Sequence, residues 1–169
     1  MPALRRCYSL DGVRLVEKVV CGLAIALGVC LRVFRFWEPS LWLDEIATAH
    51  AALAPDLATL LERCRLGFEP PLHHLMARLF LALGRSEFFL RLPALLCGLG
   101  SVALLMVCVR RVGGARGALY AGAIFALNSR GILHSQDARM YALAMLLALA
   151  SVYTMARVLE GAGQESESP

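Results

Sequence analysis

Four long apolar runs constrain the fold of this chain more than any other feature of its sequence. A helix of about 20 apolar residues crosses a hydrocarbon core of about 30 Å. The runs are VVCGLAIALGVCLRVF (19–34), FFLRLPALLCGLGSVALLMVCV (88–109), ALYAGAIFALNSRGIL (118–133) and YALAMLLALASVYTMARVL (141–159). Apolar residues make up 59% of the 169 positions, against about 45–50% in soluble domains. The sequence therefore predicts an all-α, polytopic membrane protein with about four transmembrane helices.

The basic residues predict how these helices are oriented. Arg110, Arg111 and Arg116 fall between the second and third runs, and cytoplasmic loops are enriched in arginine and lysine. This places the N-terminus in the cytoplasm and residues 36–87 in one long outer loop. Lys18 is the only lysine. The preference for arginine is typical of a GC-rich bacterial genome, so we expect a multi-pass protein of the bacterial inner membrane.

The outer loop itself has a helical pattern. WLDEIATAHAAL (42–53), LATLLERC (57–64) and PPLHHLMARLFLALG (70–84) each carry apolar residues at i, i+3 and i+4 spacing, which is typical of amphipathic helices. A helix over 70–84 would be about 20 Å long, too short to cross, and such a helix lies in the membrane interface. We expect His73 and His74 on its polar face, away from the apolar stripe.

The chain divides simply into domains. Residues 1–159 are predicted to form one transmembrane module that includes the outer loop at about 36–87. Residues 160–169 are polar and are predicted to be a disordered tail. No basic cluster is interleaved with aromatic residues, so no nucleic-acid partner is expected.

Two polar clusters interrupt this apolar sequence, and each has two readings. Asp44 and Glu45 follow Trp42 and are either a solvated pair near a helix N-terminus or a reactive pair. Asp137, Arg139 and Tyr141 are either interface anchors or part of a binding site, and Asp137 and Tyr141 share a helix face at i, i+4.

Two further polar features read as structural. Glu87 and Arg91 are expected to pair with each other at i, i+4 near the start of the second run. Glu69 would have to join His73 and His74 to hold a metal, and their spacing alone does not predict such a site.

Four motifs in order resemble one family of membrane enzymes. LWLDE (41–45), EPPLHH (69–74), SEFFLRLP (86–93) and SQDARMYAL (135–143) are similar to segments of GT-C fold glycosyltransferases, in the protein mannosyltransferase and aminoarabinose transferase superfamily. The resemblance covers about residues 15–158 and corresponds to the N-terminal part of such an enzyme. It implies transfer of a sugar from a polyprenyl-phosphate donor to an acceptor on the extracytoplasmic face of the membrane.

The resemblance also implies roles for particular residues. Asp44, with Glu45 beside it, matches the acid that acts as general base on the acceptor hydroxyl. Substrate binding is implied for the second cluster and for one histidine: Gln136, Asp137, Arg139, Tyr141 and His73. The charge of the leaving phosphate must be met by cations or by a divalent metal, and no other cofactor is implied. Glu69 and His73 stand where the family often has His and Tyr, which weakens that part of the match.

Chain length leaves a second hypothesis open. Family members usually continue through many more membrane helices, so this chain is expected to be a fragment, a split subunit completed by a second membrane subunit, or a degraded gene product. In that case it would be a non-catalytic homologue that binds lipid or a partner. A small transporter is the third reading, but transporters place ionisable groups near mid-membrane, whereas the acids here lie in the loops.

Overall fold

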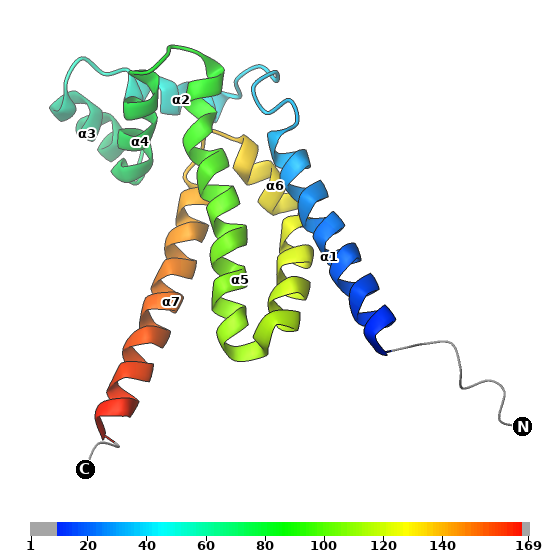
Figure 1. Cartoon of the computed structure of the whole chain (residues 1–169). Coiled ribbons are helices and arrows are strands. Elements are labelled where there is room, and N and C mark those ends of the chain that lie inside the picture. Colours follow the sequence, from blue (N-terminus) through cyan, green and yellow to red (C-terminus); the bar gives the residue numbers. More distant parts are fainter. Residues whose placement is uncertain (1–9, 167–169) are drawn as a thin grey trace, which may run out of the picture.

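The computed structural model describes residues 10–166, and all the regular structure within that range is helical (Figure 1). The all-α prediction is therefore confirmed. The seven helices in this part of the chain are α1 (Leu10–Val33), α2 (Leu43–Ala52), α3 (Leu57–Leu66), α4 (Pro71–Leu81), α5 (Glu87–Ala126), α6 (Ser129–Gln136) and α7 (Tyr141–Ser166).

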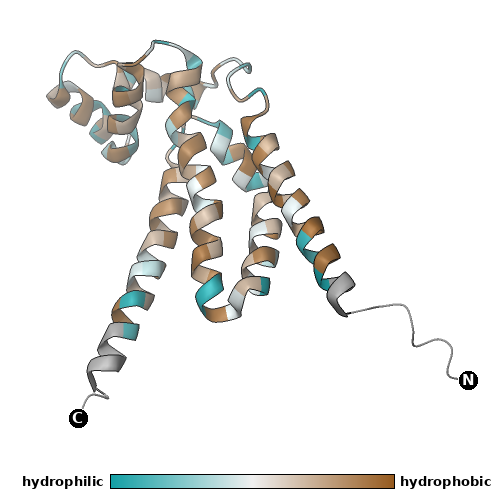
Figure 2. Ribbon diagram, viewed as in Figure 1, coloured by the Kyte–Doolittle hydropathy of each residue, from teal (hydrophilic) through white to brown (hydrophobic). Residues whose placement is uncertain are grey.

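Two of the helices within residues 10–166 are long and apolar enough to cross a membrane. They are α5 and the Tyr141–Glu160 part of α7. Helix α1 is long as well, but only 13 residues separate the charged residues Lys18 and Arg32. Its uncharged stretch is therefore shorter than the about 20 apolar residues that cross a hydrocarbon core. Apolar residues cover most of the long helices (Figure 2), and many large ones are exposed, such as Leu23 and Val152. Outward-facing apolar surface of this extent is what a lipid environment favours.

Helix α5 reverses direction in its middle. Gly114 has φ 66° and ψ −170°, a conformation that glycine adopts at low cost because it has no Cβ. The first arm (residues 87–113) and the second arm (115–126) therefore run antiparallel, as Figure 1 shows. This confirms the predicted polar turn between the second and third apolar runs. The basic residues Arg110, Arg111 and Arg116 gather at this turn.

The sequence predicts one helix over the third apolar run (118–133), whereas the structure divides this run between two helices. The second arm of α5 ends at Ala126, and α6 begins at Ser129. The cause is Asn128, whose side-chain oxygen accepts a hydrogen bond from Gly131 N at 2.8 Å and so starts a new helix as an N-cap. Helix α6 then leads the chain toward the end of the molecule where α2, α3 and α4 lie.

Three short helices form a layer at one end of the long ones (Figure 1). This three-helix layer (residues 36–86) contains α2, α3 and α4, and the predicted short helices are confirmed. The structure shows which face of α4 meets the rest of the protein. His73 and His74 are buried, whereas Leu72 and Leu79 are exposed, because the histidines find polar partners inside the protein.

A buried ion pair holds this layer to the long helices. The Arg91 Nε and Nη2 atoms donate to the two carboxylate oxygens of Glu45 at 2.8 and 2.6 Å, and both side chains are at most 2% exposed. Glu45 also accepts hydrogen bonds from the backbone N–H groups of Ala138 at 2.8 Å and Trp42 at 3.2 Å. The predicted pairing of Arg91 with Glu87 is wrong, since Glu45 takes that place.

Arg91 also fixes the segment between α1 and α2. Its guanidinium donates to the carbonyl oxygens of Phe36 at 3.1 Å, Pro39 at 2.8 Å and Ser40 at 3.4 Å. One ion pair thus joins the start of α2, the segment before it, the first turns of α5 and Ala138 in the segment between α6 and α7. All these segments meet beside Asp44 and Arg139.

Helix α7 extends further than the predicted module. It ends at Ser166 rather than near residue 159, so most of the segment predicted to be a disordered tail is helical. No proline interrupts this segment before Pro169, which leaves the helix free to continue. Residues 167–169 lie outside the described range.

Replacing Glu45 should destabilise the fold strongly. We expect Glu45→Gln to lower the free energy of unfolding in detergent micelles by about 3–5 kcal/mol, because Arg91 would be left as a buried charge without its counter-ion. The control is Glu62→Gln, whose carboxylate lies 3.8 Å from Arg65 on the surface. That variant should change stability by at most about 0.5 kcal/mol. Equal effects of the two substitutions would contradict the role given to the buried pair.

The same pair predicts how stability depends on pH. Burial opposes ionisation of Glu45, but hydrogen bonds from Arg91, Ala138 and Trp42 outweigh it, and the pKa of the carboxyl is lowered overall. A lowered folded-state pKa adds stability above the ordinary carboxyl range, and this stability is lost as the pH falls through the folded value. Acid unfolding curves should therefore show a stability loss below about pH 4.5 that is smaller in Glu45→Gln.

Candidate functional site

Ala138, one of the four residues between α6 and α7, is held at both its N–H and its carbonyl group. Ala138 N donates to Glu45, and Ala138 O lies 3.0 Å from His73 Nε2. A carbonyl only accepts, so the His73 proton sits on Nε2. Burial is the main cause that lowers the pKa of His73, which favours the neutral ring. The clamp fixes the positions of the two neighbours of Ala138, Asp137 and Arg139.

Arg139 lies between two carboxylates that come from different elements. Its Nη1 donates to Glu69 Oε1 at 2.8 Å, and its Nη2 lies 3.7 Å from Asp44 Oδ2. On the far side of Glu69, the Oε2 atom lies 2.9 Å from His74 Nε2. These contacts therefore form a line in which carboxylates alternate with nitrogen-bearing side chains. The line begins at exposed Asp44, passes through Arg139 and Glu69, and ends at buried His74.

Asp44 and Glu45 are adjacent in sequence but differ in environment. On a helix, neighbouring side chains diverge by about 100°. Glu45 points inward and has both oxygens engaged, while the Asp44 side chain is 69% exposed and has Arg139 as its counter-ion. Of the two acids, Asp44 is therefore the one that is free to accept a proton from a molecule arriving from outside.

Asp137 and Tyr141 lie beside this line. Burial, followed by repulsion from Glu45, raises the pKa of the Asp137 carboxyl. The Tyr141 ring lies 4.7 Å from that of His134 between centroids, and the guanidinium carbon of Arg139 lies 5.8 Å from the Tyr141 ring centre. Tyr141 is 43% exposed, so its ring offers an aromatic surface next to a cation.

Gln136 is directed elsewhere. Its side-chain amide donates to Leu31 O at 2.7 Å and to the carbonyl oxygens of Arg32 and Phe34 at 3.3 Å. It therefore satisfies carbonyl groups at the C-terminus of α1, which have no partner within their own helix. The remaining predicted site residues, Asp44, Glu45, His73, Asp137, Arg139 and Tyr141, gather at the end of the molecule that carries the three-helix layer.

The side chains of this site do not provide a metal centre. Among residues 10–166, no group of three or more His, Cys, Asp or Glu side chains is arranged to hold a metal ion. Glu69 is close to His74, but its other oxygen is bound by Arg139. The arrangement instead supplies a guanidinium to meet negative charge.

Sequence reasoning missed two residues of this arrangement. The local spacing pairs Arg91 with Glu87, and it offers Glu69 only as a partner of the histidines. Both fall inside the quoted motifs, Glu69 at the start of EPPLHH and Arg91 within SEFFLRLP. Their partners lie 46 and 70 positions away along the chain, which no local periodicity indicates.

Comparison with known proteins identifies a family. The sequence profile of the family described as dolichyl-phosphate-mannose-protein mannosyltransferase matches residues 68–166. The match covers more than half of the chain, including Glu69, Arg91 and Arg139, and begins after Asp44 and Glu45. No curated protein and no solved structure matches the chain significantly. On this match, the chain belongs to the dolichyl-phosphate-mannose-protein mannosyltransferase family of membrane glycosyltransferases.

Proposed function

We propose that this chain catalyses sugar transfer from a polyprenyl-phosphate donor to an acceptor on the extracytoplasmic face of a bacterial inner membrane. The observation that carries the proposal is the exposed Asp44 carboxylate, 3.7 Å from the guanidinium of Arg139. A base and a phosphate-binding cation are the two groups that such a reaction needs within reach of each other. The family match supports the reaction class.

In the proposed reaction Asp44 acts on the acceptor hydroxyl and Arg139 acts on the leaving phosphate. Asp44 takes the proton of the acceptor hydroxyl as its oxygen forms a bond to the anomeric carbon. The bond from that carbon to the phosphate oxygen breaks, and the phosphate leaves with the electron pair. Once Asp44 has taken the proton and is neutral, it no longer holds Nη2 of Arg139. This Nη2 then stabilises the negative charge of the leaving phosphate, while Nη1 stays on Glu69.

The other site residues take supporting roles in this proposal. Glu45 positions Asp44 through its pair with Arg91, and His73 positions Arg139 through Ala138. Tyr141 and Asp137 line the place of the donor, where an aromatic ring suits the face of a sugar. Gln136 acts at a distance from the reacting atoms, since it holds α1 against α6.

The orientation in the membrane follows from the charges at the other end. Arg14 and Lys18 of α1 line a cavity together with Arg116, and the turn of α5 lies at the opposite end of the molecule from the three-helix layer (Figure 1). Cytoplasmic segments carry the excess of Arg and Lys. We therefore propose four membrane passes, made by α1, the first arm of α5, the second arm continued by α6, and α7. This places Asp44 outside the cytoplasm.

The orientation can be tested with two single cysteines of matched exposure. Phe68 in the three-helix layer is 95% exposed and Val112 at the α5 turn is 94% exposed. In intact spheroplasts, a membrane-impermeant maleimide should label Phe68→Cys above the parent chain and should leave Val112→Cys at the parent level until the membrane is opened. The reverse pattern would invert the proposed topology.

Removing the proposed base should abolish transfer without unfolding the protein. We expect Asp44→Asn to slow transfer of labelled sugar from a pool of polyprenyl-phosphate sugars by about 10²–10⁴-fold, the usual contribution of a general base. Its unfolding midpoint should stay close to that of the parent. Glu62→Gln removes an exposed carboxylate from the same layer and is the control, with unchanged transfer. Full activity of Asp44→Asn would refute its role as the base. No turnover by the parent chain would favour a non-catalytic, lipid-binding or partner-binding subunit.

Arg139 should set the affinity for the donor phosphate. Hydrogen bonds to charged groups contribute about 1.5–3 kcal/mol, so Arg139→Gln should weaken donor binding by about 10–100-fold. Arg85→Gln, which removes an exposed arginine from the same layer, should leave donor binding unchanged. Equilibrium binding of a labelled polyprenyl-phosphate sugar measures both. Equal losses in the two variants would indicate a diffuse charge effect rather than a phosphate contact.

A further inference from the structure

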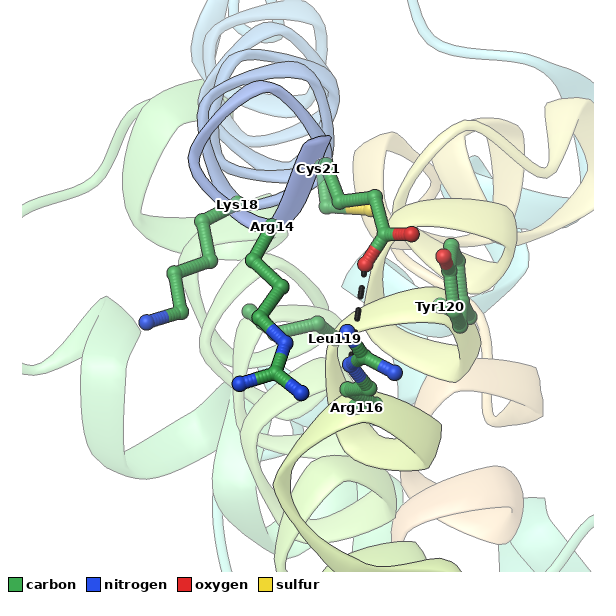
Figure 3. A pocket seen from close by; sticks show the side chains of 7 residues that line it. Arg14, Lys18, Cys21, Arg116, Leu119 and Tyr120 are labelled. Atoms are coloured by element: carbon green, nitrogen blue, oxygen red, sulfur yellow. Dashed lines mark ion pairs between the residues drawn. The ribbon is translucent and has the colours of Figure 1, made fainter. Parts of the chain in front are cut away.

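A cavity with charged side chains at its rim lies at the opposite end of the molecule from Asp44. It has a volume of about 340 Å³ and lies between α1 and the second arm of α5. Helix α1 contributes Arg14, Glu17 and Lys18, and the second arm contributes Arg116 and Tyr120 (Figure 3). The cavity is separate from the residues assigned to sugar transfer, and its role rests on the membrane orientation proposed above but not on the assignment of Asp44 and Arg139.

The cavity carries an excess of positive charge. Three cationic side chains line it against one carboxylate, which leaves a net charge of +2. Glu17 Oε2 lies 3.6 Å from Arg116 Nε, the pair marked in Figure 3, and the Arg116 side chain is 59% exposed. Neither Arg14 nor Lys18 forms an ion pair with a residue whose side chain the structure describes. The cations are therefore available to an anionic ligand.

The surroundings of the cavity indicate the source of that anion. The cavity sits near the α5 turn, where the apolar helices end, and Tyr120 lies at its edge, as tyrosine often does at a membrane interface. One turn further along the second arm, Ile124 is 75% exposed on the same helix face. If the cations hold the phosphate of a lipid, the hydrocarbon chain of that lipid can lie along the apolar surface at Ile124.

We propose that this cavity binds the phosphate of an anionic phospholipid. Basic pockets between membrane helices at the cytoplasmic side are suited to anionic head groups, and arginine forks match the oxygens of a phosphate. Arg14, Lys18 and Arg116 hold the head group, and the acyl chain passes along Ile124. The bound lipid joins α1 to the second arm of α5 at the end where Glu45 and Arg91 do not reach.

Native mass spectrometry of the full chain, released from neutral detergent, tests this site. Phosphatidylglycerol should bind at least about tenfold more tightly than phosphatidylcholine, a difference of about 1.4 kcal/mol. The double variant Arg14→Gln/Lys18→Gln should lose this preference. Glu17→Gln should strengthen it, because the acid that competes for Arg116 is gone. Arg110→Gln is the control, since Arg110 is an exposed arginine at the same end that does not line the cavity.

Each outcome of the experiment decides the proposal. Equal binding of the two lipids by the parent chain, or an equal loss of preference in Arg110→Gln, would overturn it. Displacement of phosphatidylglycerol by inorganic phosphate at equal concentration would assign the cavity to a soluble anion and overturn the lipid assignment. If the double variant does not fold, the single Lys18→Gln variant serves in its place, because Lys18 is exposed and its loss should still reduce the preference.

Discussion

The buried ion pair between Glu45 and Arg91 is the interaction on which the arrangement of this protein depends. Taking two charges out of water costs several kcal/mol each, and only close geometry with further hydrogen bonds offsets this cost. Here both requirements are met, because Arg91 contacts both oxygens of Glu45 and three backbone carbonyls besides. The pair therefore selects one way of docking the three-helix layer onto the long helices.

This docking separates the roles of two neighbouring acids. Glu45 is directed inward and is committed to Arg91 and Ala138, which leaves Asp44 at the surface with Arg139 as its partner. His73 completes the arrangement from α4 by binding the other side of Ala138. In our proposal Asp44 is the proton acceptor and Arg139 is the cation that binds the phosphate. The residues that bring them together contact neither the sugar donor nor the acceptor. The reactive pair is exposed, and the groups that position it are buried.

The helices were largely predictable from sequence, and their partners were not. Apolar periodicity indicated the short helices of the layer, and the arginines between the second and third apolar runs indicated the turn of α5. Periodicity does not say whether an apolar stripe faces protein or lipid, and so the burial of His73 and His74 in α4 was not predictable. The break at Asn128 depends on one side-chain cap inside an otherwise apolar run.

The residues of the candidate site were predictable only where they lie within one of the four motifs. Asp44, Arg139 and Tyr141 lie in quoted motifs with charges that are unusual in so apolar a chain. The partner of Arg91 is 46 positions away, whereas a local rule suggested Glu87. Gln136 lies in the same motif as Arg139, yet its amide faces the end of α1. Motif membership therefore located the region, and only the fold assigned contacts within it.

A double-mutant cycle on Glu45 and Arg91 tests the central claim most directly. The free energy of unfolding and the rate of sugar transfer would be measured for Glu45→Gln, for Arg91→Gln and for both together. If the pair acts as one unit, the double variant should be less damaged than the sum of the single variants by at least about 1.5 kcal/mol in stability, with transfer following the same pattern. Additive losses within about 0.5 kcal/mol would show that the two residues act independently and would contradict the account.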